Sequence, residues 1–172
     1  MTLQDLGSIG EFVAALATLA TLAYLALQIR QNTDSVKAAA AQSVVEALNQ
    51  ALQSAASSPQ QARIVVLGQT DYEKLSDDER MQFMIWFLGW FRILEQAYHS
   101  HLLGHLEPRI WNGHARHLEG VMQAPAIRRW WKLRRSVFSS EFQEFVEDLG
   151  DSASVSTPAA LFEEMRHEDP DA

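Results

Sequence analysis

Five of the six histidines lie close together in the sequence, between residues 99 and 117. Imidazole binds zinc, copper and iron, so such a cluster would support metal or haem binding. Side chains three or four positions apart share one face of a helix, so Glu95 would lie beside His99, and His114 beside His117. The candidate ligands of a mixed two-helix site are Glu95, His99, His114 and His117. The alternative is that these histidines are solvated or hydrogen-bonded where two helices meet, since the Glu and His spacing of helical di-iron sites is absent.

A second group of residues is the stretch RRWWKLRR at 128–135, in which five cations are interleaved with two tryptophans. On an anionic inner leaflet, Trp130 would lie among the headgroups and each cation would add about 1 kcal/mol. Alternatively, the cations pair with acidic groups and the tryptophans belong to the core. Nucleic acid is a less suitable partner because the chain has a net charge of −8. The candidate contact residues are Arg128, Arg129, Trp130, Lys132, Arg134 and Arg135.

Charge is distributed unevenly along the second half of the chain. Residues 107–138 hold seven basic and two acidic side chains, whereas residues 139–172 hold one basic and ten acidic side chains. Opposite charges attract. We therefore expect the basic and acidic segments to pair, with each other or with a second subunit.

No other pattern in the sequence supports catalysis. The chain has no cysteine, which excludes disulfides, thiolate metal sites and a thiol nucleophile. It has neither a glycine-rich phosphate loop nor a GxSxG motif, and Ser100 beside the histidines lacks a positioned acid. We therefore predict no catalytic residue and no cofactor.

The elements that would position these residues begin with an apolar stretch at residues 9–29. After Glu11 no charged residue occurs until Arg30, and the run between them is about 18 residues, or roughly 27 Å as a helix, close to the thickness of a thin bilayer. We predict one transmembrane helix within residues 1–30. The alternatives are a buried helix of a soluble bundle and a helix lying in the membrane interface. A cleaved signal peptide is disfavoured because no Lys or Arg precedes the run.

The flanks of this stretch predict its orientation. Arg30 and Lys37 follow it, so the positive-inside rule places the N-terminus outside and the rest of the chain in the cytoplasm. Small residues at Ala14 and Thr18 would let another helix approach closely, which makes them candidate oligomer contacts. If several copies formed a pore, Thr18, Thr21 and Gln28 would line it.

The rest of the chain predicts an all-α domain, a bundle of about five helices over residues 31–150. Apolar residues at helical spacing, with Ser, Asp and Pro at the starts, mark the helices. Residues 151–172 are expected to form a linker, a short helix and an acidic tail. The expected helices are 34–57, 60–68, 81–104, 108–123, 125–137 and 140–150, with a capping box at Ser76–Glu79 before the third.

The helix at 81–104 is apolar nearly all round in its first half. That half covers only about fourteen residues before Arg92, short of the roughly twenty that a membrane span needs. A central core helix is therefore expected. Its surplus apolar surface also indicates a subunit contact, for which Trp86 and Trp90 are candidates.

The chain resembles a group of small bacterial proteins in which an N-terminal apolar helix precedes a helical domain. The resemblance rests on Tyr24–Thr33 (YLALQIRQNT), on LSDDER at 75–80, on Glu95, on Leu106-Glu107 before Trp111, and on the stretch from Pro125 to Phe145. It implies one membrane anchor followed by a helical domain. It transfers no catalytic or binding residue. With the predicted orientation, we expect a single pass of the bacterial inner membrane with the helical domain in the cytoplasm.

Together these patterns predict a non-enzymatic, membrane-anchored interaction or structural protein. The expected partners are membrane lipid and either further copies of the chain or the subunits of a larger membrane complex. The alternatives are a metal- or haem-binding helical enzyme, which the histidines would serve, and an oligomeric membrane pore.

Overall fold

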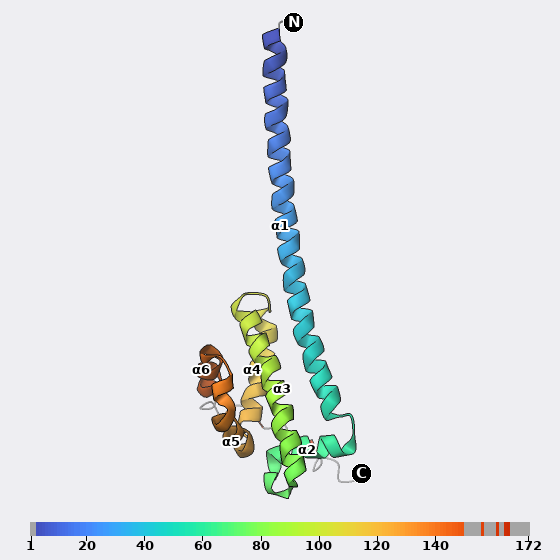
Figure 1. Ribbon diagram of the computed structural model, residues 1–172, viewed down its shortest axis with the longest axis vertical. Coiled ribbons are helices and arrows are strands. Elements are labelled where there is room, and N and C mark those ends of the chain that lie inside the picture. Colours follow the sequence, from blue (N-terminus) through green and yellow to red (C-terminus); the bar gives the residue numbers. More distant parts are fainter. Residues whose placement is uncertain (1–2, 150–155, 157–160, 162–163, 166–172) are drawn as a thin grey trace. The chain divides into compact units, whose positions relative to one another are not determined.

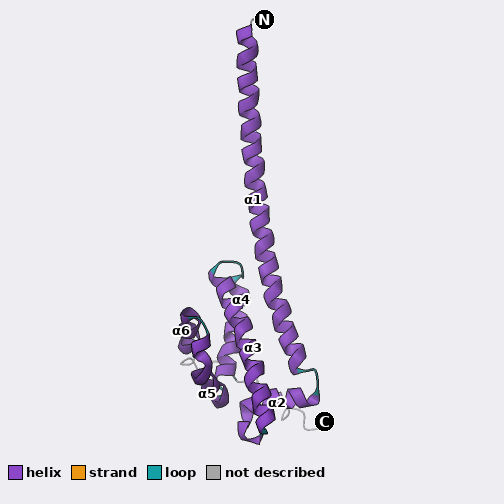
Figure 2. Cartoon of the chain, in the orientation of Figure 1, coloured by secondary structure: helices purple, strands orange, loops and turns teal. Residues whose placement is uncertain are grey.

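The computed structural model describes residues 3–149, 156, 161 and 164–165, and in this part of the chain all regular structure is helical (Figure 2). The predicted all-α class is confirmed. Six α-helices and two 3-10 turns follow one another (Figure 1). They are α1 (Leu3–Ala55), α2 (Pro59–Thr70), η1 (Tyr72–Lys74), α3 (Asp77–Leu102), α4 (Pro108–Met122), α5 (Pro125–Arg134), η2 (Arg135–Val137) and α6 (Ser140–Leu149).

The chain divides into two units, residues 1–39 and residues 40–172. We call residues 10–39 the N-terminal segment and the second unit the helical unit. The helical domain was predicted to begin at residue 31, whereas the helical unit begins at Ala40. The predicted linker, short helix and acidic tail at 151–172 lie largely outside the described residues.

Every side chain of the N-terminal segment is exposed, although the segment is strongly apolar. Its best 18-residue window has a mean hydropathy of 2.0, and none of that window is buried. The large apolar side chains are exposed on all faces, from Phe12 (65%) to Ile29 (68%). Its polar side chains bond within the helix: Thr18 Oγ1 donates to Ala14 O over 2.9 Å and Thr21 Oγ1 to Ala17 O over 2.8 Å.

The helical assignment of α1 continues through the polar residues 32–35. Thr33 Oγ1 donates to Ile29 O at 2.9 Å and Ser35 Oγ donates to Gln31 O at 2.9 Å. A hydroxyl that bonds to a carbonyl one turn earlier is a mid-helix arrangement and not a cap. The helix ends only at Ala55, before the Ser58 cap of α2, whose Oγ accepts from the Gln61 N–H.

The centre of the helical unit is α3. It begins as predicted, because Ser76 Oγ accepts from the Glu79 N–H and the Glu79 carboxylate accepts from the Ser76 N–H. Its buried face carries Phe83, Phe87 and Phe91 into the main core. α2 approaches α3 closely at Gly68, where a Cβ would overlap the Phe83 ring.

A smaller core closes the other end of the helical unit. Val44 of α1 is 1% exposed and lies with Ala97, Leu106 and Trp111, which come from the end of α3, the connection to α4 and the start of α4. α3 and α4 lie side by side, joined by a turn in which Gly104 has a φ of 69°. That conformation suits glycine, because it is strained for residues with a side chain.

Candidate interaction surface on helix α5

Helix α5 separates its aromatic and cationic residues onto opposite faces. Pro125 opens the helix as predicted, because a first-turn residue needs no N–H donor. Ile127, Trp130 and Trp131 are all at most 3% exposed. Trp130 stacks on Phe91 with ring centroids 4.9 Å apart, and its Nε1 donates to Met84 O over 3.2 Å. The inner face of α5 therefore belongs to the core.

The predicted contact of Trp130 with lipid headgroups is wrong, since its ring is 2% exposed. Apolar area gains more from a dry core than from the membrane boundary, and the indole N–H already has its acceptor inside the domain. The interpretation in which the two tryptophans are core residues fits the structure. Only the cations of this stretch are available to a partner.

The outer face of α5 carries cations that have no ion pair among the described residues. Arg128, Arg129 and Lys132 are exposed on this face, whereas Arg134 is half-buried and lies at the end of the helix, four residues after Trp130. Arg135 differs from them, because its guanidinium pairs with the Glu147 carboxylate of α6. We call Arg128, Arg129 and Lys132 the cationic face.

A groove lies beside the cationic face, between α5 and the start of α3. Its volume is about 670 Å³, within the range of small-molecule pockets. Its walls are largely apolar, while Arg80 and Arg129 contribute guanidinium groups and Glu73 and Asp77 contribute carboxylates. The lining side chains include Met81, Phe83, Met84, Trp130 and Leu133. We call this cavity the α3–α5 groove.

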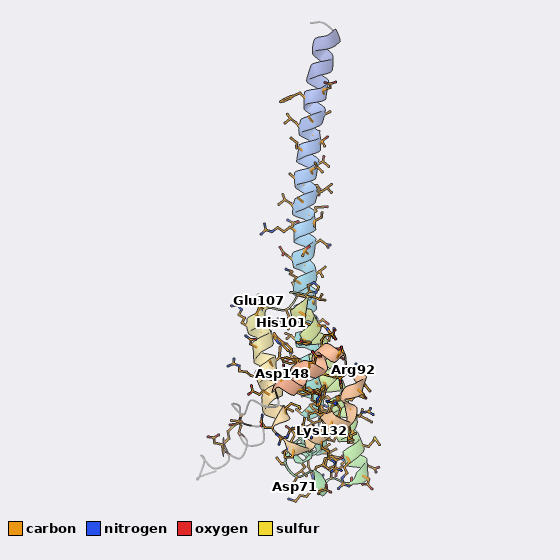
Figure 3. The ribbon with its side chains drawn as sticks, turned by 90° about the vertical axis from the view of Figure 1, so that its left-hand side faces the viewer. Asp71, Arg92, His101, Glu107, Lys132 and Asp148 are labelled. Carbon is orange, nitrogen blue, oxygen red and sulfur yellow. The ribbon has the colours of Figure 1, made fainter. Side chains whose placement is uncertain are left out.

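The groove lies at the end of the helical unit remote from Ala40, where the chain enters it. The groove uses residues 77–84 of α3, whereas Val44 packs on Ala97, about sixteen residues or roughly 24 Å further along the helix. Figure 3 shows the same arrangement within the helical unit: Asp71 lies at one end with Lys132 nearer to it, and His101 and Glu107 lie at the other end.

No protein-family model, curated protein or solved structure matches the chain. The assignment of its function therefore rests on the residues and their geometry.

Glu95 and His99 lie on one face of α3, as their spacing predicted. Both contact Ser139, the residue before α6. Glu95 Oε1 accepts from the Ser139 N–H over 2.7 Å and Oε2 accepts from Arg92 Nη1 over 2.8 Å. His99 Nε2 lies 3.1 Å from Ser139 Oγ. Burial alone would raise the pKa of Glu95, but these hydrogen bonds outweigh it and lower the pKa below its ordinary value. The network fixes the start of α6 on α3.

The other two candidate ligands lie on α4 in apolar surroundings. His114 Nε2 is buried without a hydrogen-bond partner among the described residues, and burial lowers the pKa of His114. The His117 ring lies edge-on to Trp90 at 5.8 Å. His117 is exposed as a whole, and the partial packing of its ring together with the nearby His114 lowers its pKa. Within the described residues, no group of three or more His, Asp or Glu side chains is placed to hold a metal ion.

The predicted oligomer contacts fall into two classes. Ala14 and Thr18 are exposed on the N-terminal segment. Trp90 is 4% exposed and packs against Phe87 and Phe91, so its use as a subunit contact is wrong. Trp86 is half-buried against Phe87. Most of the surplus apolar surface of α3 is covered by α2, α4 and α5, which leaves little of it for a subunit contact.

The α3–α5 groove was not predicted from the sequence. Met81 and Leu133 are 61% and 68% exposed, although each looks like a core residue from its apolar neighbours. A careful helical register places Leu133 on the opposite side of α5 from Ile127 and Trp131, which is the signal that was available. The pairing of this side with α3 depends on how the helices pack.

Proposed function

We propose that the protein is a membrane-anchored interaction subunit. In this proposal residues 12–29 cross the bacterial inner membrane once, with the N-terminus outside. The helical unit lies in the cytoplasm and binds a protein partner, either another copy or a subunit of a larger membrane complex. No catalytic step is part of the proposal.

The observation that carries the proposal is the exposure of the N-terminal segment. The core helix of a soluble protein buries its apolar side chains, whereas none of the most apolar window here is buried within the chain. The apolar side chains also occur on all faces, from Leu16 (50% exposed) through Leu19 (63%) to Leu22 (57%). A helix that is apolar all round needs an apolar environment on every side, which a bilayer supplies.

The polar groups of the segment are compatible with lipid. The hydroxyls of Thr18 and Thr21 donate to carbonyls one turn earlier, and Gln28 Nε2 donates to the Tyr24 hydroxyl over 2.8 Å. A donor that is satisfied within its own helix costs less in hydrocarbon than a free one. The same bonds leave these hydroxyls with less to offer a water-filled pore.

The cationic face is the surface that we assign to the partner. Arg128, Arg129 and Lys132 lie together on one helix, exposed and without ion pairs in the described part of the chain. Charge complementarity therefore favours an acidic surface on the partner. The acceptor we expect is therefore a cluster of Asp and Glu on the partner.

Alkaline extraction of native membranes tests the anchor. Membranes that carry the chain tagged at Ala172 are washed at high pH, and the chain is followed in pellet and supernatant. Retention in the pellet is expected, with the C-terminal tag accessible only after the inner membrane is opened. Release into the supernatant would overturn the anchor.

Native mass spectrometry of the complex, extracted in mild detergent, tests the interaction. A complex with reproducible foreign subunits or with further copies is expected. The triple variant Arg128→Glu, Arg129→Glu and Lys132→Glu should dissociate it, whereas the control variant Arg116→Glu, at an exposed cation of α4, should not. A monomeric wild-type chain in the membrane would overturn the interaction and leave the anchor standing.

A further inference from the structure

The α3–α5 groove combines an apolar floor with one free guanidinium at its edge. Met81, Met84 and Leu133 contribute flexible apolar side chains, and the Trp130 ring closes the floor. Two of these side chains are largely exposed, Met81 at 61% and Leu133 at 68%. Apolar side chains held open to water at a concave site gain free energy when an apolar ligand covers them.

The charges in the groove are not equivalent. Glu73 and Asp77 are both held by Arg80, whose Nη2 lies 3.1 Å from Glu73 Oε2 and whose Nη1 lies 3.3 Å from Asp77 Oδ1. Arg80 also lies over the Tyr72 ring at 5.4 Å. Arg129, on the α5 side, has no ion pair or hydrogen bond among the described residues. The α5 side of the groove therefore offers an unused cation, while the two carboxylates on the other side share the single guanidinium of Arg80.

A second unused donor lies at the opposite wall. The Nε of Arg80 is buried and has no hydrogen-bond partner among the described residues, although both Nη atoms are occupied. A buried donor without a partner costs free energy that a bound acceptor would recover. The groove therefore presents two guanidinium groups and no unpaired carboxylate.

We infer that the α3–α5 groove binds a long-chain carboxylate, with its head at Arg129 and its alkyl chain along Met81, Met84 and Leu133. The planar guanidinium fork matches the two oxygens of a carboxylate. The groove lies about 24 Å along α3 from the contact of Val44, near which the chain enters the unit. Arg129 also belongs to the cationic face, so a carboxylate bound in the groove and an acidic partner on that face would compete for this residue.

Photocrosslinking tests the inference on the full chain. The protein is reconstituted in nanodiscs of phosphatidylcholine and irradiated with a diazirine-bearing dodecanoate, and the modified residues are identified by peptide mass spectrometry. We expect adducts on the peptides that contain Met81, Met84 and Leu133. Adducts on residues 12–29 report probe dissolved in the bilayer and serve as the internal reference.

Two competitors define the chemistry of the site. Unlabelled dodecanoate should suppress the groove adducts at roughly tenfold lower concentration than dodecanol, which has the same chain without the charge, because a charge-assisted hydrogen bond is lost. Equal competition would overturn the role of the carboxylate. Suppression by a synthetic peptide of residues 157–172 but by neither amphiphile would show that an acidic segment is the occupant and would overturn the inference.

Three variants locate the site. Arg129→Glu should lower the groove adducts roughly tenfold relative to the internal reference, whereas Arg128→Glu, an exposed cation next to it that does not line the groove, should leave them unchanged. Ala126→Trp, which fills the groove without changing charge, should abolish them. Circular dichroism verifies that each variant is folded. Equal adduct yields in Arg129→Glu and Arg128→Glu, or adducts restricted to residues 12–29, would overturn the inference.

The same experiment separates this inference from the proposed membrane anchor. If residues 12–29 do not enter the bilayer, the chain does not stay with the nanodiscs and the reference adducts disappear, while the groove adducts persist on the free protein. If the groove is not a site, the reference adducts persist and the groove adducts are absent. Each failure therefore has its own pattern.

Discussion

The N-terminal segment and α3 are both apolar helices, and the chain treats them in opposite ways. α3 buries Phe83, Phe87 and Phe91 to 2% exposure or less, whereas Phe12 of the N-terminal segment remains 65% exposed. α3 packs against α2 and α4, and its Phe91 stacks on Trp130 and Trp131 of α5. The N-terminal segment has no such neighbours in the described part of the chain.

The difference shows that apolar content does not by itself decide where a helix is buried. α3 interrupts its apolar surface with Arg92 and Glu95, whose charges are paired at 2.8 Å and mark the side that meets α6. The N-terminal segment has no charged residue from Phe12 to Ile29 and so marks no side. A core helix carries the polar groups that fix its register, and a membrane helix omits them.

The largest expected effect is the loss of membrane insertion of the N-terminal segment. Leu19→Arg combined with Leu22→Arg should cost about 5–7 kcal/mol of membrane insertion, because each arginine at the centre of a span costs about 2.5–3.5 kcal/mol. The chain should then appear in the supernatant of the alkaline extraction. The matched pair Val45→Arg and Leu52→Arg, at exposed apolar positions of α1 within the helical unit, should leave the chain in the pellet.

The next effect concerns the core of the helical unit. Phe91→Ala should lower the free energy of unfolding of this unit by about 3–5 kcal/mol, since its ring is fully buried and stacks on Trp130 and Trp131 at 4.9 and 5.1 Å. Urea unfolding followed by tryptophan fluorescence measures this unit alone, because all five tryptophans lie between residues 86 and 131.

Phe12→Ala is the control for that measurement, because Phe12 is exposed and lies outside the helical unit. Its urea midpoint should equal that of the wild type. A shift as large as that of Phe91→Ala would contradict the comparison, since it would mean that the two regions share one cooperative core.

A smaller effect tests the close approach of α2 to α3. Gly68→Ala should destabilise the helical unit by about 1–3 kcal/mol, because a Cβ at this position overlaps the Phe83 ring. Gly89→Ala is the matched variant on α3. Nothing lies within 4 Å of its Cβ position, so it should stabilise the unit by about 0.5–1 kcal/mol through helix propensity. Two changes of the same sign would contradict this packing.

The smallest effect is a difference in pH dependence. The pKa of Glu95 is lowered in the folded unit, so its carboxylate stabilises the fold above the unfolded pKa near 4.5, and this contribution disappears as the pH falls through the lower folded value. Glu95→Gln should cost about 1 kcal/mol at pH 7. Its urea midpoint should also fall less than that of the wild type between pH 5 and pH 3. Parallel declines would show that the Ser139 contact does not depend on the charge.

Local features of the fold could be predicted from the sequence, and the contacts between distant segments could not. The Ser76–Glu79 capping box and the prolines that open α4 and α5 act within one helical turn, so their residue types suffice. Thr33 and Ser35 are less predictable, because a hydroxyl can bond either forward to an N–H as a cap or backward to a carbonyl within a helix, and sequence does not choose between them.

The site shows the same limit. The spacing of Glu95 and His99 correctly placed both on one face of α3, but their partner, Ser139, lies 44 and 40 residues away in the chain. The histidine cluster looked like a ligand set only because its members are close in sequence, while helix packing directs His114 and His99 to different neighbours. The groove depends on the same packing, so the cations of α5 were predicted and their apolar neighbour on α3 was not.

The burial of Val44 also has a consequence for the order in which the protein folds during its synthesis. Its partner Trp111 leaves the ribosome on the order of 70 residues after Val44, which at 5–20 residues per second is a delay of several seconds. If the N-terminal segment inserts as proposed, it does so during this delay, before the helical unit can close. The rate of translation through residues 45–111 therefore affects whether Val44 first packs on Trp111 or is first bound by a chaperone.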